Sequence, residues 1–226
     1  MVLISIIFFL GLSFSSLALS AAKNGITPTP SSKQAIQSML AYVPADAELI
    51  YELGCGFGGL GLAAAKAFPE AKVIGLENSF FPFVVAHFRQ KISRVKNLKI
   101  IKRDFYVADF NALADIPKES YEDIVMHLQE EIPRKKPQKI FLAYLCTSAM
   151  EKLKPKLKKE LKEKNLLISN FFKVHGWKEL PAEEMGVDLG LGQTKHAPLS
   201  KDIFVYSSKS VLEPFSSSHS MMASDS

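Results

Sequence analysis

The feature that most constrains this chain is a glycine-rich loop between an apolar strand and an Ala-rich helix. Residues 49–53 read Leu-Ile-Tyr-Glu-Leu, closely spaced glycines follow at Gly54, Gly56 and Gly58, and a helix is predicted over 59–68. Glycine lets the backbone turn sharply and lets a ligand approach where a Cβ would collide. The helix that follows points its unpaired N–H groups at the same place. The pattern therefore predicts a small-ligand site at the tip of this strand.

Two ligand classes fit such a loop. Gly54, Gly56 and Gly59 match the G-x-G-x-x-G pattern of dinucleotide-binding proteins, which alone is a weak signal. Glu52, two residues before the first glycine, favours a different ligand, because a carboxylate attracts a cationic sulfonium amino acid and repels a pyrophosphate. A glycine turn that binds no ligand is the plainer interpretation.

The run Glu52-x-Gly54-x-Gly56-x-Gly58 resembles the first motif of the class I S-adenosylmethionine (SAM) methyltransferases. The resemblance covers about residues 35–206. It implies that Glu52 lies near the ammonium end of the methionine moiety and that the glycines pass beneath that moiety. The expected cofactor contacts come from the loop and the next two strand ends: Glu52, Gly54, Cys55, Gly56, Gly58, Glu77, Asn78, Asp104 and Phe105.

Two acids end the second and third predicted strands. Glu77 follows the glycines by about 20 residues, which is the usual place of an acid that binds a ribose diol. In the methyltransferase pattern, Asp104 hydrogen-bonds the adenine amino group, and Phe105 or Tyr106 lies against the ring. The plainer interpretations are an exposed strand-end acid for Glu77 and a turn residue or helix cap for Asp104.

The order of predicted elements gives the fold class. Strands alternate with helices, which is typical of a Rossmann-like α/β fold with a doubly wound, mainly parallel sheet in a three-layer αβα arrangement. The predicted strands are 48–53, 72–77, 98–104, 139–144, 166–172 and 202–207, and the predicted helices are 31–42, 59–68, 81–94, 120–131 and 148–164. After residue 177, a loop through Gly186, Gly190 and Gly192 is expected instead of a helix. The 226 residues suit one domain and leave little chain for the second domain that a nicotinamide-linked dehydrogenase needs.

The stretch from Tyr144 to Trp177 is similar to small lysine-type methyltransferases, including those acting on ATP synthase subunit c. The fourth-strand tip, 143–147, lacks the Asn-Pro-Pro-Tyr motif of amide and adenine N-methyltransferases, which argues against those acceptors. Methyl transfer does not need a nucleophile from the protein, so no catalytic residue is assigned. The acceptor-side candidates are Tyr144, Cys146 and Trp177, with Phe80 and Phe81 beside them; each also fits plain packing.

The two ends of the chain differ from its middle. Residues 2–22 are apolar and uncharged, which predicts an N-terminal hydrophobic helix that anchors the protein in a membrane, with the domain on the cytoplasmic side. Export after signal cleavage near residues 18–22 is the alternative. Residues 31–207 are expected to form the methyltransferase domain. The Ser-rich tail, 208–226, is expected to be disordered.

Charge and cysteine content narrow the partners. The net charge is +5, and lysines gather in residues 152–164, either as a solvated helix face or as a contact for anionic lipid headgroups. The sequence lacks the combined basic and aromatic stripe that would predict nucleic-acid binding. It also lacks the spacing of Cys and His residues that would predict a metal site. Cys55 and Cys146 follow the first and fourth strands, which are neighbours in such a sheet. They are predicted to be free thiols on one rim beside the ligand.

The sequence thus predicts a SAM-dependent methyltransferase whose acceptor is unidentified, with a protein lysine as one candidate. Two alternatives stay open. One is a nicotinamide-linked oxidoreductase, and the other is a non-catalytic module that binds SAM. The identity of the bound ligand distinguishes the oxidoreductase from the methyltransferase. Transfer of a methyl group distinguishes the non-catalytic module from the methyltransferase.

Overall fold

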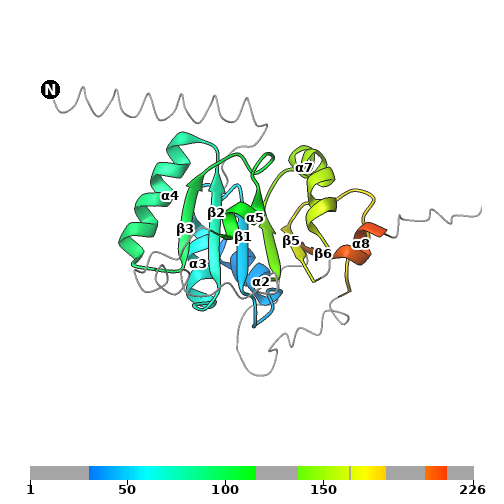
Figure 1. Ribbon diagram of the computed structural model, residues 1–226, viewed down its shortest axis with the longest axis horizontal. Coiled ribbons are helices and arrows are strands. Elements are labelled where there is room, and N and C mark those ends of the chain that lie inside the picture. Colours follow the sequence, from blue (N-terminus) through cyan, green and yellow to red (C-terminus); the bar gives the residue numbers. More distant parts are fainter. Residues whose placement is uncertain (1–30, 116–136, 163, 182–201, 213–226) are drawn as a thin grey trace, which may run out of the picture.

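The computed structural model describes residues 31–115, 137–162, 164–181 and 202–212. They contain a six-stranded sheet of order β3-β2-β1-β4-β5-β6 (Figure 1). The strands are β1 Leu49–Leu53, β2 Lys72–Glu77, β3 Leu98–Lys102, β4 Lys139–Ala143, β5 Leu166–Asn170 and β6 Ile203–Tyr206. Strands β1 to β5 are parallel, and β6 runs antiparallel to β5. The predicted mainly parallel, Rossmann-like sheet is confirmed.

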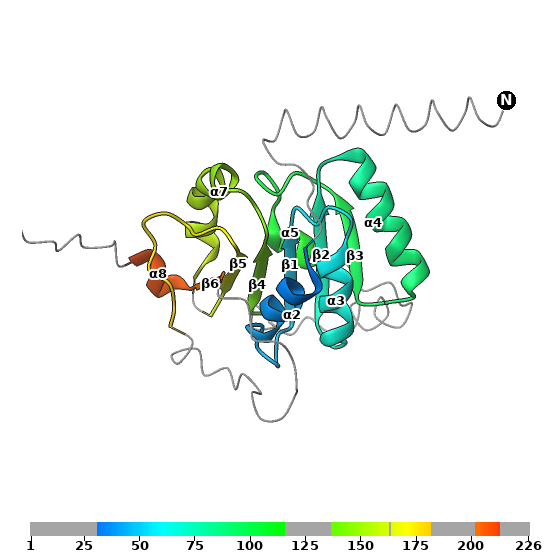
Figure 2. The ribbon, with the colours of Figure 1, turned by 180° about the vertical axis from the view of Figure 1, so that it is seen from behind.

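Helices cover both faces of the sheet (Figures 1 and 2). The first face carries α5 Phe110–Ala114 and α7 Thr147–Glu160, and the second face carries α2 Lys33–Ala41, α3 Gly59–Ala67 and α4 Phe80–Ser93. A short helix, α8 Ser208–Leu212, follows β6 at the sheet edge. The central strands β1 and β4 are buried along their whole length, as expected for parallel strands covered on both sides.

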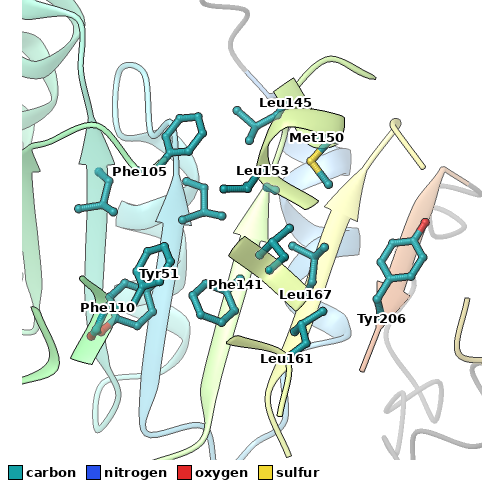
Figure 3. Packing of buried hydrophobic residues seen from close by; sticks show 14 of the residues in the cluster. Tyr51, Phe105, Phe110, Phe141, Leu145, Met150, Leu153, Leu161, Leu167 and Tyr206 are labelled. Atoms are coloured by element: carbon teal, nitrogen blue, oxygen red, sulfur yellow. The ribbon is translucent and has the colours of Figure 1, made fainter. Parts of the chain in front are cut away.

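Each face has its own hydrophobic core, because side chains alternate along a strand. On β1, Tyr51 points to the first face and Ile50 to the second. The first core is aromatic: the Tyr51 ring stacks on Phe141 with centroids 5.4 Å apart, and Phe110 packs against both rings (Figure 3). The second core is aliphatic: Leu, Ile and Val predominate, and alanines such as Ala64 and Ala86 lie among them.

The strand order reverses at β1, which pairs with β2 on one side and β4 on the other. In such sheets the crevice outside the carboxyl ends of the strands, at this reversal, is where ligands bind. The glycine loop follows β1 directly, so it lies at this crevice. The topology therefore supports the place that the sequence predicts for the ligand.

Two short helices were not predicted. Helix α5 forms because Asp109 caps it, its Oδ1 accepting from the backbone N–H groups of Asn111 and Ala112, and because Phe110 is buried. Helix α8 occupies the start of the tail that was expected to be disordered, and the backbone N–H of Ser207 donates to Ser210 Oγ there. The predicted helix 120–131 and the loop through residues 186–192 lie outside the described residues.

The predicted membrane-anchored localisation is corrected. No helix within residues 31–115, 137–162, 164–181 and 202–212 is long and apolar enough to cross a bilayer. The predicted anchor, residues 1–22, lies outside these ranges, and no N-terminal hydrophobic helix is among the described elements. The reason for the error is that uniform apolar character over 21 residues fits a membrane span but does not establish one.

Candidate cofactor site

The glycine loop turns through three residues with positive φ, at Gly54 (72°), Gly56 (51°) and Gly58 (75°). A Cβ at Gly54 would lie 3.0 Å from Leu145 Cδ2, and one at Gly58 would lie 3.1 Å from Ala86 Cβ. A Cβ at Gly56 would meet nothing within 4 Å. Gly54 and Gly58 are therefore required by packing, whereas Gly56 borders open space that a ligand can occupy.

Glu77 is tied to this loop. Its Oε2 accepts the backbone N–H of Gly56 at 2.8 Å, and its Oε1 accepts the backbone N–H of Ser79 at 2.7 Å. The side chain is buried, and Asn78 beside it is half-buried. The structure thus brings Gly56 and Glu77 together at the carboxyl ends of β1 and β2, and the interpretation of Glu77 as a plain exposed acid does not hold.

Glu52 lies on the second face, beneath α3. A Cβ added to Gly61 of that helix would sit 2.6 Å from Glu52 Oε2, so only glycine lets the helix pack here. Among the described residues, Glu52 Oε2 is a buried oxygen without a hydrogen-bond partner. Burial, assisted by the charge of Glu77, raises the pKa of Glu52 from 4.5 to about 8, while the Gly61 N–H and the Arg89 charge oppose the shift.

Asp104 and Phe105 form the turn after β3. Asp104 Oδ1 accepts the backbone N–H of Tyr106 at 2.8 Å, and its carbonyl accepts from Ala108, as expected of a turn residue. The Phe105 ring is buried, and its Cε1 lies 3.4 Å from the Cβ position of Gly54. Phe105 and Leu145 therefore close the loop from the first face (Figure 3).

A lysine of α7 that no motif identified holds this turn. Lys156 Nζ donates to the carbonyl of Phe105 at 2.7 Å and to that of Ala108, and it lies 4.3 Å from the centre of the Phe110 ring. Burial lowers the pKa of Lys156. Its one sequence signal is its position beside Leu157 in the buried stripe of α7, which sets it apart from the exposed lysines of that helix.

The acceptor-side candidates do not gather at one point. Tyr144 lies after β4 with its ring 6.3 Å from that of Phe172, which follows β5. Cys146 Sγ is 3.1 Å from Ser148 Oγ at the start of α7. Trp177 instead packs edge-on against Tyr206 of β6, with ring centroids 5.9 Å apart. Tyr144 and its aromatic neighbour are the pair that lies at the strand tips.

Phe80 and Phe81 lie at the start of α4. The Phe81 ring packs edge-on against Phe57 of the glycine loop, with centroids 6.4 Å apart, whereas the side chain of Phe80 is exposed. Phe81 therefore borders the loop, and Phe80 begins the outer surface of the helix.

The two cysteines belong to different cores, and Cys55 is buried, so the prediction that both lie accessible on one rim does not hold for Cys55. Cys55 belongs to the core of the second face, whereas Cys146 packs against the core of the first face. The positive φ of Gly54 interrupts the strand alternation, so Cys55 turns to the face opposite Leu53. Burial and the nearby charge of Glu52 raise the pKa of the Cys55 thiol. Both cysteines are free thiols.

Comparisons with known proteins give the class of enzyme. Residues 46–156, which hold the glycine loop, Glu77 and Asp104, match the family described as "Putative methyltransferase". A protein-lysine N-methyltransferase of Saccharolobus islandicus (strain REY15A) is 27% identical over 171 residues, which are 72% of this chain and 84% of the relative. The chain is a class I SAM-dependent methyltransferase.

A solved structure supports the same fold. The RNA methyltransferase from Salinibacter ruber, crystallised with S-adenosyl-L-homocysteine, matches with a TM-score of 0.52 and 20% identity, over 79% of this chain and 91% of that chain. At this identity the match concerns the fold of the methyltransferase. Within the described ranges, no group of three His, Cys, Asp or Glu side chains is placed to hold a metal ion.

Proposed function

We propose that this methyltransferase transfers the methyl group of SAM to the side-chain amine of a protein lysine. The lysine acceptor rests on the relative from S. islandicus, which is named a protein-lysine N-methyltransferase. When bound, SAM supplies a methyl group already activated by a sulfonium. The residues of the chain then have to hold the cofactor, exclude water and admit the acceptor.

The pairing of Gly56 with Glu77 carries the cofactor part of the proposal. Open space lies where a Gly56 side chain would be, and the Glu77 carboxylate is fixed beside it by the Gly56 N–H. A carboxylate held in this way can accept further hydrogen bonds from the two hydroxyls of a ribose. The rest of this side of the cofactor site is formed by Gly54, Gly58, the backbone of Cys55 and Asn78.

The turn after β3 supplies the adenine side. We assign to Asp104 the bond to the adenine amino group, through the carboxylate oxygen that does not bind the turn, and to Phe105 the apolar floor beneath the ring. Glu52 is sealed beneath α3, so it acts on the site through the loop. Because its pKa is raised to about 8, Glu52 is mainly protonated at neutral pH, and only its ionised form would favour the cationic cofactor over the neutral thioether product.

The acceptor side is assigned to the tips of β4 and β5. A lysine amine attacks only when neutral, and apolar surroundings lower the pKa of an amine. Tyr144 and Phe172 offer aromatic faces that suit the aliphatic stem of a lysine. Trp177 is left with a packing role, and the Cys146 side chain, which makes no cap hydrogen bond to α7, is left with its contact to the Ser148 hydroxyl.

Calorimetry with S-adenosylhomocysteine tests the cofactor site. Glu77→Ala should weaken binding by roughly 1–3 kcal/mol, because the ribose hydroxyls lose a charged acceptor. Glu48→Ala, an exposed acid at the opposite end of β1, is the matched control and should bind as the wild type does. Unchanged affinity in a folded Glu77→Ala protein contradicts the ribose role, and binding of NAD in place of S-adenosylhomocysteine would favour the oxidoreductase.

Transfer from tritiated SAM into a cell extract tests the acceptor. The label is expected in Nε-methyllysine after acid hydrolysis of the protein fraction. An extract whose lysines have first been blocked by acetylation is the control and should take up little label. Label in lipid, in nucleic acid or in another amino acid contradicts a lysine acceptor. Binding of S-adenosylhomocysteine with no transfer into any fraction supports the non-catalytic module.

A further inference from the structure

The outer surface of α4 carries a continuous line of exposed apolar side chains. Phe80, Val84, Phe88 and Ile92 recur at every fourth residue and are 64%, 43%, 64% and 62% exposed. We call these four residues the α4 stripe. Residues four apart form one ridge of a helix surface. The outer face of a surface helix is ordinarily polar, and contiguous apolar surface marks an interaction site.

The stripe lies in a basic part of the chain that contains no acidic residue. Residues 78–103 contain no Asp or Glu, and they contain seven basic side chains: Arg89, Lys91, Arg94, Lys96, Lys99, Lys102 and Arg103. One of these, Lys102, has its Nζ 6.0 Å from the centre of the Phe80 ring. This stretch therefore carries a charge of +7 that no acid within it offsets, and α7 carries another group of basic residues. The surface therefore suits a partner that is both apolar and acidic.

The stripe also begins at the cofactor site. Phe80 follows Glu77 by three residues, and the neighbouring Phe81 ring packs against Phe57 of the glycine loop. Arg89 Nη1, on the second turn from Phe81, donates to the carbonyl of Phe57 at 2.6 Å and fixes the helix to the loop. A polypeptide lying along α4 would thus have one end close to the edge where the methyl group is transferred.

The chemistry of the surface selects among possible occupants. A second copy placed on the stripe about a twofold axis would bring like charges together, because α4 carries Arg89 and Lys91 and no acid, and Lys102 lies beside its first turn. A nucleic acid would meet aliphatic Val84 and Ile92 where it needs stacking platforms. An amphipathic helix with acidic flanks matches both the apolar line and the charge.

We propose that the α4 stripe docks the acceptor protein through an amphipathic segment with an apolar face and Asp or Glu on its flanks. This proposal rests on the proposed lysine methyltransferase function and adds to it the recognition of the acceptor. Docking along α4 raises the local concentration of the target lysine at the strand tips. Selectivity for an acceptor would then come from α4, outside the cofactor site.

Fluorescence anisotropy with a designed peptide tests the docking directly. The probe is a labelled 20-residue helical peptide with Leu at positions i, i+4, i+7 and i+11 and Glu on both flanks, and its control replaces every Glu by Lys. The Glu peptide should bind wild-type protein and the Lys peptide should not. Phe88→Gln should weaken binding at least about tenfold, whereas Phe88→Leu, which keeps the apolar contact, should stay within about threefold. Lys91→Glu, with Lys96→Glu as a second charge reversal, should also weaken binding and reduce its dependence on salt.

Two further measurements separate this proposal from the proposed function. S-adenosylhomocysteine affinity and melting temperature should be the same in Phe88→Gln and wild type, since the ring is exposed. Methyllysine formation in the extract should fall at least about tenfold in Phe88→Gln and be restored in Phe88→Leu. Absence of methyllysine with the wild type would refute the lysine acceptor, whereas normal methyllysine formation in Phe88→Gln would refute the docking alone.

Other occupants appear as distinct outcomes that overturn the docking. Binding to phosphatidylserine vesicles with none to the Glu peptide would assign the stripe to a lipid surface. A dimer in light scattering that Phe88→Gln dissociates would assign it to a second copy. A large fall in melting temperature in Phe88→Gln, with no binding of any probe, would assign it to residues 2–22 of the chain itself.

Discussion

On the face covered by α5 and α7 the centre of the sheet is packed by aromatic rings, whereas aliphatic side chains, alanines and glycines pack the face under α3 and α4. Tyr51, Phe110 and Phe141 form the first core, with ring centroids 4.9 to 5.4 Å apart. On the second face glycines let other groups approach: a Cβ at Gly75 would lie 2.7 Å from Ile100 Cδ1 and 3.2 Å from Cys55 Sγ. Close approach on this face places α3 and α4 against the glycine loop, and it leaves Glu52 sealed inside.

The helices that cover the two faces also differ on the outside. Three of the lysines of α7 make contacts within the molecule: Lys156 holds the turn after β3, Lys152 lies 4.3 Å from the Tyr106 ring centre, and Lys154 donates to the carbonyl of His175. The outer surface of α4 instead exposes the α4 stripe. A run of lysines is therefore a poor guide to a partner surface, because their long stems can reach backbone carbonyls of neighbouring loops.

The largest effect is expected where the second face is tightest. Gly61→Val should lower the free energy of unfolding by about 3 kcal/mol, because its Cβ would lie 2.6 Å from Glu52 Oε2 and 3.4 Å from Leu98 Cδ1. Urea denaturation measures this. Gly59→Ala, whose Cβ would have its nearest neighbour at 4.0 Å, is the control and should change stability by less than about 0.5 kcal/mol. Equal stability of Gly61→Val and wild type would contradict the close packing of α3 on β1.

On the first face, the test is the lysine that holds the turn after β3. Lys156→Met should lower the free energy of unfolding by about 2 kcal/mol, because two carbonyls lose a charged donor. It should also weaken S-adenosylhomocysteine binding, because Asp104 in the released turn is displaced. Lys156→Arg should retain part of the stability and part of the affinity. The control is Lys159→Met, an exposed lysine of the same helix. A Lys156→Met protein as stable as this control would mean that α7 is an ordinary solvated basic helix.

The contrast also explains what the sequence could and could not predict. The six strands begin and end within two residues of their predicted bounds, because long apolar runs bounded by glycines and acids leave little choice. That the glycine loop and Glu77 lie at the same edge of the sheet followed from strand order, whereas the hydrogen bond from Gly56 to Glu77 did not. The faces of Cys55 and Cys146 did not, because the positive φ of Gly54 interrupts the alternation that would have sent Cys55 to the face of Leu53.

Helix α4 shows the same limit. The apolar residues of 80–92 predict a helix, but they lie on more than one side of it. Pro82 and Ala86 are buried, and the larger Phe88 and Ile92 are exposed. Size and hydrophobicity would have placed the larger pair in the core. The close approach of α4 to the glycine loop requires small side chains on the inner face, and that requirement is visible only in three dimensions.

A pH-dependent effect, smaller within any one pH unit, distinguishes the sealed acid of the second face. Burial raises the pKa of Glu52 to about 8 in the folded protein, so between about pH 5 and pH 8 the folded state keeps a proton that the unfolded chain has lost. The contribution of Glu52 to stability is therefore complete below about pH 4.5 and is lost as pH rises to about 8, at about 1 kcal/mol per pH unit. In Glu52→Gln this slope should be absent. Parallel pH profiles of the melting temperature in variant and wild type would show that Glu52 is already ionised in the fold.

The smallest effects are expected at the two thiols. Replacing each Cys by Ser changes one sulfur to oxygen and so compares the two faces of the sheet. Cys55→Ser should lower the free energy of unfolding by about 1 kcal/mol, because it buries a hydroxyl in the aliphatic core of the second face. Cys146→Ser should change stability by less than about 0.5 kcal/mol, since this residue is half-buried beside the Ser148 hydroxyl. An alkylating reagent should correspondingly modify Cys146 first and reach Cys55 only on unfolding, because both burial and a raised pKa withhold the reactive thiolate. If both thiols were alkylated at the same rate in the folded protein, both would be accessible on one rim. That result would contradict the assignment of Cys55 and Cys146 to opposite faces of the sheet.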